Sequence, residues 1–550
     1  MSRKKNEIDG ALDVAAHDIN EDGSLKPENI TVFGPDHGMN AFSEERSFPE
    51  NIVPDLSDLK LDDDDSPKAG WCPNGNWSSG ICRPYNNEHR VRWMAAYGSA
   101  KHLRVQDAIL PGTHQSAFDK RAAYTPSMET CQDVTVHTQL HAGIRVIDIR
   151  VQFYSGYPAG DSRRFMIFHS GNNGRTIQGD ILNALLDFYS DVRNRGEVVV
   201  LDFHEFKGFT VAAHLELAGV IKNSLRGLIA PHKFRSFNLA QLAALGKTVV
   251  IAYQNDNRNP DFWTGVNQRW IGSDQPTSSQ LKAFIDKVAA ESKGPWELKS
   301  IQAAKYNKLF HTPDDMSPDI MSWFASGTAA SPIMKHYIIN TDWSLRHRLV
   351  DNIIYANQFR FGYYNETWAC YEPTNYIPYR LSLIYWVFYG CSRSNIILPD
   401  PANSPYGEHG LVVAIGREIS TTLTIRHSIF PADINVPMSA GDVAAFVYLN
   451  KRWEFVCEVY TPNTNGSMVP PPPFGEKFAR YVLSDGNKAS PIRLAPYAEK
   501  INSVVFVTSS ATSVIEIYGA HIVGGQHLYL KEGGTYAFAY AGGGMWRLLN

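Results

Sequence analysis

The sequence predicts an α/β protein in which a β/α barrel is followed by one or two all-β modules. Between residues 106 and 360, short β-branched runs alternate with helix-like segments such as LNALLDFYSDVRNRG, a pattern typical of a parallel sheet. Several of these runs end in ionisable residues, as strands do at the active end of a β/α barrel. From about residue 405, short β-rich runs separated by turn residues replace the helices, which predicts all-β structure.

Length and composition indicate three parts. The chain has 550 residues, enough for two to four domains. Its hydrophobic and charged contents are ordinary for a folded protein, and its net charge of −4 gives no sign of a nucleic-acid binder. We expect a polar, disordered arm over residues 1–65, the barrel domain over 66–400 and the β modules over 405–550.

The N-terminal arm and the cysteines bear on where in the cell the protein acts. The arm begins with basic residues but lacks an apolar core, so we expect no signal peptide. No apolar run reaches the ~18 residues of a membrane span. We therefore expect a cytoplasmic protein, or one exported without a signal that acts at a membrane surface. Cys72 and Cys82 are candidates for a disulfide, which the sequence leaves open.

Four apolar runs of the barrel region end in residues that can do chemistry. His114 ends the first, Asp148 and Arg150 the second, His169 the third and His204 the fourth. Asp148 and Arg150 are two residues apart, so they face the same side of a strand. Two histidines serve acid-base chemistry, and a fixed arginine stabilises an anion such as a phosphate.

The rest of the barrel region continues the alternation. We expect strands within 246–256, 267–274 and 334–343, a helix at SSQLKAFIDKVAAESKG and a closing helix at SLRHRLVDNIIYANQF. The later β-rich runs show no clean repeat and no motif that names a ligand, and the proline run at 470–473 reads as a linker.

Several common motifs are absent. There is no G-x-S-x-G elbow and no H-E-x-x-H sequence, which argues against a serine-type hydrolase and a metalloprotease. The segment LGKTVV is not a phosphate loop, because Gln241 stands where that loop needs a glycine five residues before Gly246.

An ordered series of motifs resembles a known family. LPGTHQSAF, QLHAGIRVIDIRV, FHSG and EVVVLDFHEF resemble the X domain of phosphatidylinositol-specific phospholipase C, as do the later RWIGSDQPTSSQLKAFI and IINTDWSLRHRLVDNIIYAN. The resemblance covers roughly residues 100–358 and is strongest to the bacterial, metal-independent type. It implies an irregular, incompletely closed β/α barrel that cleaves phosphatidylinositol, or its glycosylated forms, to diacylglycerol and inositol 1,2-cyclic phosphate.

The resemblance also implies roles for individual residues. His114 matches the general base, His169 the general acid, and Asp342 the carboxylate that orients the base. Arg150 resembles the arginine of the metal-independent enzymes, and Asp148, which points the same way, is a further candidate catalytic residue.

The same comparison bears on metals and substrate contacts. Calcium-dependent relatives carry acids at the positions of Arg150 and His204, and an asparagine at that of Gln115. Calcium needs several oxygen ligands, so we expect no metal and no other cofactor. Gln115, His204 and Tyr253 are the candidate substrate contacts, since His204 and Tyr253 fall near the positions of head-group-binding residues in the bacterial enzymes.

The expected partner is a membrane surface containing phosphatidylinositol, with a glycan or lipid as a candidate ligand of the β modules and no nucleic acid. Two alternatives remain open. One is a magnesium phosphodiesterase of the glycerophosphodiester or sphingomyelinase D kind, which needs a carboxylate cluster. The other is a non-enzymatic glycan- or lipid-binding protein that uses the barrel as a scaffold.

Overall fold

A computed structural model describes most of the chain from residue 75 onward, in two compact units of which the first ends at Arg360. The expected arm at 1–65 lies outside the described residues, as does Cys72 of the expected disulfide. The described residues are 75–78, 81–84, 90–96, 100–124, 129–291, 293–294, 296–306, 312–326, 331–360, 363–364, 383–388, 395–398, 411–416, 421–426, 428, 430, 432–439, 442–449, 452–473 and 476–550.

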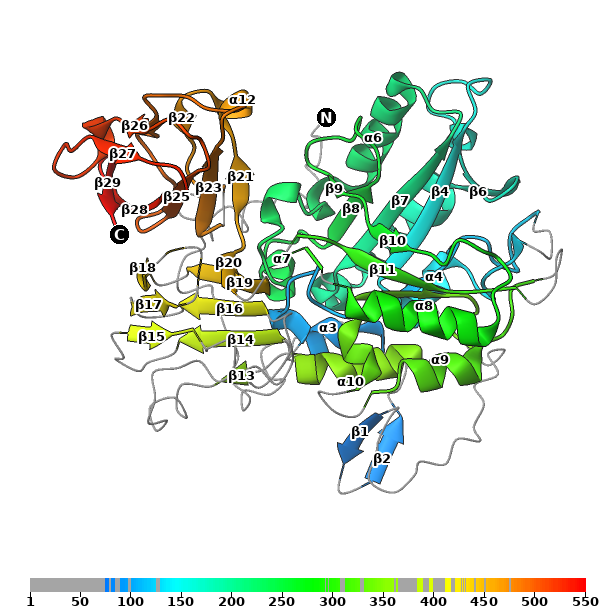
Figure 1. Cartoon of the computed structure of the whole chain (residues 1–550). Coiled ribbons are helices and arrows are strands. Elements are labelled where there is room, and N and C mark those ends of the chain that lie inside the picture. Colours follow the sequence, from blue (N-terminus) through cyan, green and yellow to red (C-terminus); the bar gives the residue numbers. More distant parts are fainter. Residues whose placement is uncertain are drawn as a thin grey trace, which may run out of the picture. The chain divides into compact units, whose positions relative to one another are not determined.

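The first unit is built on a sheet in which eight strands run parallel (Figure 1). Among the described residues no ladder joins the two edge strands, β9 and β10, so the barrel is open between them. The expected irregular β/α barrel is thus confirmed. In their order across the sheet the strands are β10 (Asn267–Arg269), β11 (Lys299–Ala303), β12 (Ile338–Thr341), β3 (Leu110–Thr113), β4 (Val146–Phe153), β7 (Val199–Lys207), β8 (Val249–Tyr253) and β9 (Trp263–Thr264).

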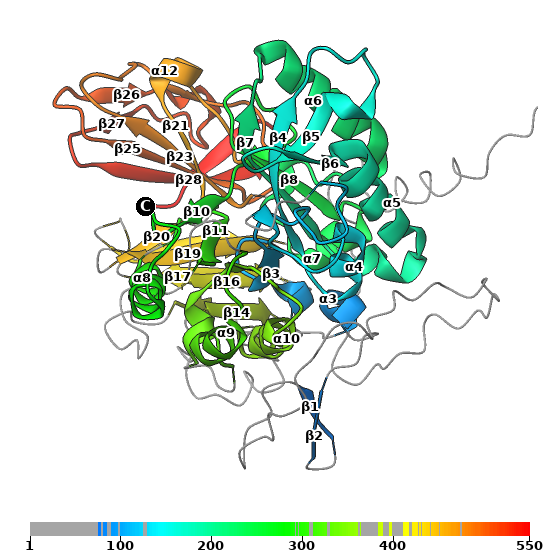
Figure 2. The ribbon, with the colours of Figure 1, turned by 90° about the vertical axis from the view of Figure 1, so that its right-hand side faces the viewer.

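Helices cover the outside of this sheet, with α5 and α6 beside β4, β7 and β8 in Figure 2. The helix expected at SSQLKAFIDKVAAESKG is α8. A capping box of Thr277 and Gln280 starts it, and it buries Leu281, Ile285 and Val288 along one face. The helices are α3 (Trp93–Ala96), α4 (Val136–His141), α5 (Asn183–Ser190), α6 (Val211–Leu225), α7 (Leu239–Ala244), α8 (Ser278–Ala290), α9 (Ser317–Trp323) and α10 (Leu349–Arg360), and a separate hairpin is formed by β1 (Gly75–Ser78) and β2 (Ile81–Pro84).

The last helix of the first unit, α10, is hydrogen-bonded to the residue just before β3, the first strand of the parallel sheet in chain order. The side-chain amide of Asn357 accepts from the backbone N–H of Ile109 at 2.9 Å and donates to its carbonyl oxygen at 2.8 Å. Both backbone groups of Ile109, just before β3, are therefore satisfied by one buried side chain of α10. The expected closing helix is confirmed.

One of the four expected parallel strands runs the other way. Strand β5 (Phe165–Phe168) pairs antiparallel with β4 and with β6 (Asn172–Thr176). The prediction that this run continues the parallel sheet is therefore wrong, because the chain turns straight back along the end of β4 with no crossover helix between them. His169 consequently comes from a hairpin.

The second unit is all β, as expected, and contains the same arrangement twice. Each half has a five-stranded sheet in which two parallel pairings are followed by two antiparallel ones. The sequence analysis found no clean repeat, so this duplication is a new finding. The first half has β13 (Tyr363–Tyr364), β14 (Leu383–Phe388), β15 (Asn395–Ile397), β16 (Leu411–Gly416), β17 (Thr421–Ile425), β18 (Ile434–Met438), β19 (Val443–Leu449) and β20 (Arg452–Phe455). The second has β21 (Glu458–Tyr460), α12 (Pro462–Asn465), β22 (Met468–Val469), β23 (Phe478–Leu483), β24 (Arg493–Leu494), β25 (Val504–Ser509), β26 (Ile515–Ile517), β27 (Leu528–Leu530), β28 (Thr535–Gly542) and β29 (Met545–Leu548).

The two halves share a core. Phe455 of the first half and Phe506 of the second pack against each other with ring centroids 4.2 Å apart and the rings tilted by 44°, within one cluster of buried side chains drawn from both halves. The proline run at 470–473, predicted to be a linker, lies inside the second half between β22 and β23. The expected domain boundary near 400 also differs from the observed division, because β14 pairs with β16 of the second unit.

Candidate active site

His114 and Asp342 form a hydrogen-bonded pair. Strands β3 and β12 run in parallel with Thr113 opposite Thr341, so the residues that follow them leave the sheet side by side. His114 Nδ1 lies 2.8 Å from Asp342 Oδ1, and the carboxylate is buried while the imidazole is 13% exposed. The carboxylate thus holds the ring proton on Nδ1 and leaves Nε2 free of a proton, which is the arrangement of a general base.

The backbone beside this pair is strained and firmly held. The next residues, Gln115 and Trp343, have φ angles of 48° and 51°. Left-handed backbone costs a non-glycine residue about 1–3 kcal/mol and persists only where the surroundings enforce it. Gln132 provides part of that support, because its amide donates to the carbonyl oxygens of His114 at 2.8 Å and Thr341 at 3.0 Å.

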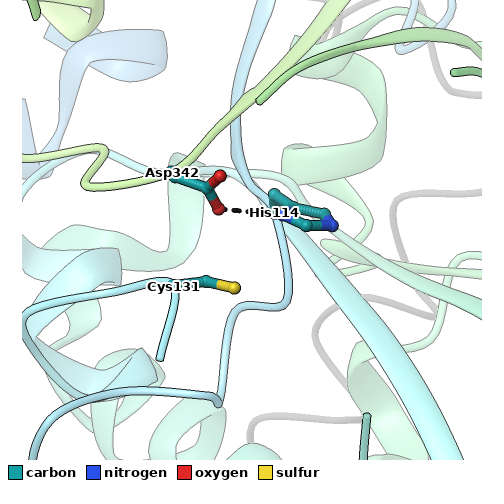
Figure 3. Close-up of side chains that lie close together, drawn as sticks. All are labelled: His114, Cys131 and Asp342. Carbon is teal, nitrogen blue, oxygen red and sulfur yellow. Dashed lines mark hydrogen bonds and ion pairs between the residues drawn. The ribbon is translucent and has the colours of Figure 1, made fainter. Parts of the chain in front are cut away.

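The thiol of Cys131 lies beside the pair, as Figure 3 shows. In the described parts of the chain, the side chains grouped closely enough to hold a metal ion are His114, Cys131 and Asp342, whose donor atoms lie within 4.8 Å of one another. A metal would require the thiolate, but burial and the negative charge of Asp342 raise the pKa of the Cys131 thiol well above its ordinary value. Since Nδ1 of His114 is also engaged with Asp342, the three residues do not fit a resident metal site.

Arg150 is held by two consecutive side chains of β7. Its Nε donates to His204 Nε2 at 3.1 Å, and one of its terminal nitrogens lies 3.2 Å from Glu205 Oε2. A β-bulge makes this possible, because His204 is the extra residue between the pairs Ile149–Phe203 and Arg150–Glu205. The guanidinium is permanently charged and 23% exposed, so it can bind the oxygens of a phosphate.

Two buried carboxylates, Asp148 and Asp202, are neighbours on β4 and β7. His204 Nδ1 lies 3.0 Å from Asp148 Oδ1. From the edge strand β10, Gln268 Nε2 reaches Asp202 Oδ2 at 2.6 Å and His204 Nδ1 at 3.0 Å. Burial acts to raise the pKa of both acids, but His204 and other nearby positive charges hold that of Asp148 at about 2. The pKa of Asp202 is raised to about 7 by burial and by the charge of Asp148.

His169 lies close to the same charges. Its ring packs edge-on against Phe118 with centroids 5.7 Å apart, and its buried Nδ1 has no hydrogen-bond partner among the described residues. Burial and the positive charges of Arg150 and His114 lower the pKa of His169 to about 3. The imidazole is therefore neutral at pH 7 in the protein alone.

The structure brings most of the predicted site residues together. The charges of His114, Asp148 and Arg150 all act on His169, and His204 contacts Arg150. This agrees with the expectation that Asp148 and Arg150 face the same way.

Two of the predicted substrate contacts, Gln115 and Tyr253, are buried. Gln115 is buried, at 1% exposure. Tyr253 is buried on the helix-facing side of β8, where its hydroxyl lies 2.8 Å from Nδ1 of His214 on α6. Its strand neighbour Phe203 alternates with the site residues Asp202 and His204, so Tyr253 points away from the site.

Three residues that the sequence analysis did not single out support the site: Gln132, Asp202 and Gln268. Asp202 carried a signal, because strand alternation places it on the same face as His204. The two glutamines carried none, since a glutamine after a loop or in a polar strand is common on any protein.

Comparisons of the sequence with known proteins agree with its motifs. No family model matches the chain. Over 142 residues, 25% of this chain, it is 27% identical to the PI-PLC X domain-containing protein 1 of Mus musculus and 26% identical to that of Homo sapiens. The chain spans 39% and 42% of the length of these relatives. Over these 142 residues the chain is thus similar to PI-PLC X domain-containing proteins, as the motifs predicted.

Solved structures similar to this chain include two bacterial enzymes. A phosphatidylinositol-specific phospholipase C from Staphylococcus aureus is 14% identical, with a TM-score of 0.39 over 49% of this chain and 98% of its own. The phosphatidylinositol-specific phospholipase C from Listeria monocytogenes is 17% identical, with a TM-score of 0.37 over 49% of this chain and 99% of its own.

Within the described residues, every helix is too short or too polar to cross a membrane.

Proposed function

We propose that this protein is a phosphodiesterase of the phospholipase C type, which cleaves phosphatidylinositol or its glycosylated forms to diacylglycerol and inositol 1,2-cyclic phosphate. The observation that carries the proposal is the His114–Asp342 pair, 2.8 Å apart, in one site with Arg150 and His169. The likeness to PI-PLC X domain-containing proteins supports the substrate class.

The proposed reaction begins at His114. Its Nε2 takes the proton of the inositol 2-hydroxyl, and the oxygen attacks the phosphorus of the same lipid. Asp342 stabilises the imidazolium that forms, and the guanidinium of Arg150 holds the phosphate oxygens. The bond from phosphorus to the diacylglycerol oxygen then breaks, and that oxygen takes a proton from His169.

His169 needs help to act as the acid, because its pKa of about 3 leaves it neutral at pH 7. The phosphate of the substrate carries a negative charge and would lie against Arg150. That charge offsets the cation that disfavours the imidazolium, so substrate binding raises the pKa of His169. Nδ1, which has no hydrogen-bond partner among the described residues, is then a site where the added proton can reside.

The proposed reaction needs no metal ion. Arg150 stands where calcium-dependent relatives have an acid, and it is positioned by His204 at 3.1 Å and Glu205 at 3.2 Å. A guanidinium supplies positive charge to the phosphate in the place of a cation. Activity in excess chelator is therefore expected to equal activity in millimolar calcium or magnesium. Activity that vanishes in chelator would favour the magnesium-dependent alternative.

The deciding experiment separates the base from the acid. His114→Ala and His169→Ala are each expected to lower turnover of phosphatidylinositol by at least ~10². An inositol phosphodiester with a nitrophenyl leaving group needs no proton to leave, so it is expected to restore turnover in His169→Ala and not in His114→Ala. Equal losses of the two variants on both substrates would reject these roles, and a wild-type protein that cleaves neither would favour the non-enzymatic alternative.

We also propose that the protein binds peripherally to membranes that contain phosphatidylinositol. The full chain is expected to sediment with vesicles that contain phosphatidylinositol more than with pure phosphatidylcholine vesicles. Equal sedimentation with both would contradict this. A glycan or lipid ligand of the second unit remains a prediction, which binding to a glycan array and to mixed lipid vesicles would test.

A further inference from the structure

The candidate acid His169 lies at the turn of the hairpin formed by β5 and β6. Its Nδ1 has no hydrogen-bond partner among the described residues, and its ring packs edge-on against Phe118. The position of the imidazole therefore depends on the backbone of the turn. The backbone N–H of His169 donates to the carbonyl oxygen of Gly171 at 3.0 Å, which closes the turn from one side.

Glu129 holds the other side of this turn. Its carboxylate accepts hydrogen bonds from the successive backbone N–H groups of Ser170 and Gly171. Two successive N–H groups that point at one place form a good site for an anion, and an ionised acceptor makes such hydrogen bonds stronger than a neutral one does. Glu129 is only 4% exposed, so water competes little for its oxygens.

The residues that follow Glu129 hold the candidate base. The carbonyl oxygen of Cys131 accepts from the backbone N–H of Trp343 at 2.8 Å, directly after the carboxylate of the base pair. Gln132 donates to the carbonyl oxygen of His114 at 2.8 Å. One short segment thus contacts the backbone of the base pair at one end and the turn of the acid at the other.

The strand that leaves the turn is fastened separately. In β6, Asn173 Nδ2 donates to the carbonyl oxygen of Ala117 at 2.7 Å, and Arg175 lies 2.8 Å from Asp119. Strand β5, which enters the turn, pairs with β4. The hairpin is therefore expected to form without the carboxylate of Glu129, and loss of that carboxylate is expected to free the turn alone.

We propose that Glu129 is a positioning residue for His169. Its carboxylate holds the N–H groups of Ser170 and Gly171, and this fixes the turn so that the imidazole faces the leaving oxygen of the substrate. Gln132 holds the base independently. The inference deepens the proposed function, on which its effect on turnover rests. Glu129 acts through the turn and touches no reacting atom.

The first test measures the turn and needs no turnover. Hydrogen exchange of the full chain is followed by mass spectrometry in peptides that cover residues 168–172, because hydrogen-bonded N–H groups exchange slowly. Glu129→Ala is expected to speed exchange at Ser170 and Gly171 about tenfold, the scale of one hydrogen bond to a charged group. Gln132→Ala is expected to leave it as in wild type. Equal exchange in wild type and Glu129→Ala would overturn the inference, even in a protein that cleaves no lipid.

The second test compares two leaving groups. On phosphatidylinositol, Glu129→Ala is expected to lower kcat by ~10–10² with little change in KM, because a displaced catalytic group costs up to about 10²-fold. The inositol phosphodiester with a nitrophenyl leaving group needs no acid, so Glu129→Ala should cleave it within about threefold of wild type. Gln132→Ala, which disturbs the base, should lower turnover of both substrates.

The pattern of losses separates this inference from the proposed function. Equal losses of Glu129→Ala on both substrates would overturn the role of Glu129, whereas a His169→Ala protein that the nitrophenyl substrate does not restore would overturn the assignment of the acid itself. Glu129→Gln keeps the shape and one acceptor oxygen, so it should free one of the two N–H groups and show a smaller loss of the same pattern. If Glu129→Ala does not fold, unchanged exchange of the turn in Glu129→Gln would still overturn the proposal.

Discussion

Replacement of Asp342 by asparagine tests the catalytic pair with little change of shape. His114 Nδ1 and the Asp342 carboxylate lie 2.8 Å apart, and at an effective dielectric constant of about 20 the imidazolium formed in the proposed reaction would be attracted to that carboxylate by about 6 kcal/mol. Since about 1.4 kcal/mol is tenfold in rate, removal of the charge is expected to lower kcat/KM by about 10⁴. The neutral amide can also turn its N–H groups toward His114 and force the ring proton onto Nε2, which removes the base.

The assay follows phosphatidylinositol cleavage in detergent micelles by 31P NMR, with melting temperatures measured alongside. Asp342 Oδ2 has no hydrogen-bond partner among the described residues, so a buried amide group there should cost only about 1–3 kcal/mol of stability. Asp187→Asn is the matched control, because Asp187 forms a 2.6 Å contact with His137 on the surface and should leave turnover unchanged. Turnover of Asp342→Asn within tenfold of wild type would refute the assignment of His114 as the base.

Further predictions concern Arg150, two buried histidines and a buried ion pair. Arg150→Lys should keep the melting temperature and lose most turnover in both chelator and calcium, because the planar fork is lost; near-normal turnover would contradict this. Burial lowers the pKa of His336 to about 3 and of His347 to about 4, so the unfolded chain binds more protons below about pH 6.5. The free energy of unfolding should therefore fall as the pH falls from about 6.5 toward 4, and an equal melting temperature at pH 7 and pH 5 would count against it. Glu197→Gln should destabilise the protein by about 3–5 kcal/mol in urea unfolding, because Arg145, 2.8 Å away, would remain buried without its partner; a loss below 1 kcal/mol would be inconsistent with that pairing.

The sequence indicated which candidate residues would lie together more readily than it indicated the residues that hold them in place. His114 follows the strand LPGT and Asp342 follows IINT, so parallel strand ends already indicated where both residues would meet. Strand alternation correctly placed Asp148 and Arg150 on one face. The same alternation would have identified Asp202, had it been applied to the fourth run.

Other features carry no local signal. The direction of the short run Phe165–Phe168 depends on a turn and a partner strand that lie outside it. Strand β11 has the sequence KSIQA and is buried throughout, although only Ile301 and Ala303 are apolar. The bulge at His204 depends on the register between two strands. The duplication of the second unit is visible in the order and direction of its strands.

The pairing of β12 with β3 has a consequence for how activity appears during folding. This pairing brings together parts of the chain that are far apart in the sequence, since His114 and Asp342 are separated by 228 residues. A ladder of such long range carries a high entropic cost of loop closure and tends to form late. Chains in which β3, β4, β7 and β8 have already assembled would still hold His114 without its carboxylate. Under the proposed mechanism, turnover is therefore expected to return on refolding only after β12 has paired with β3 and brought Asp342 to His114.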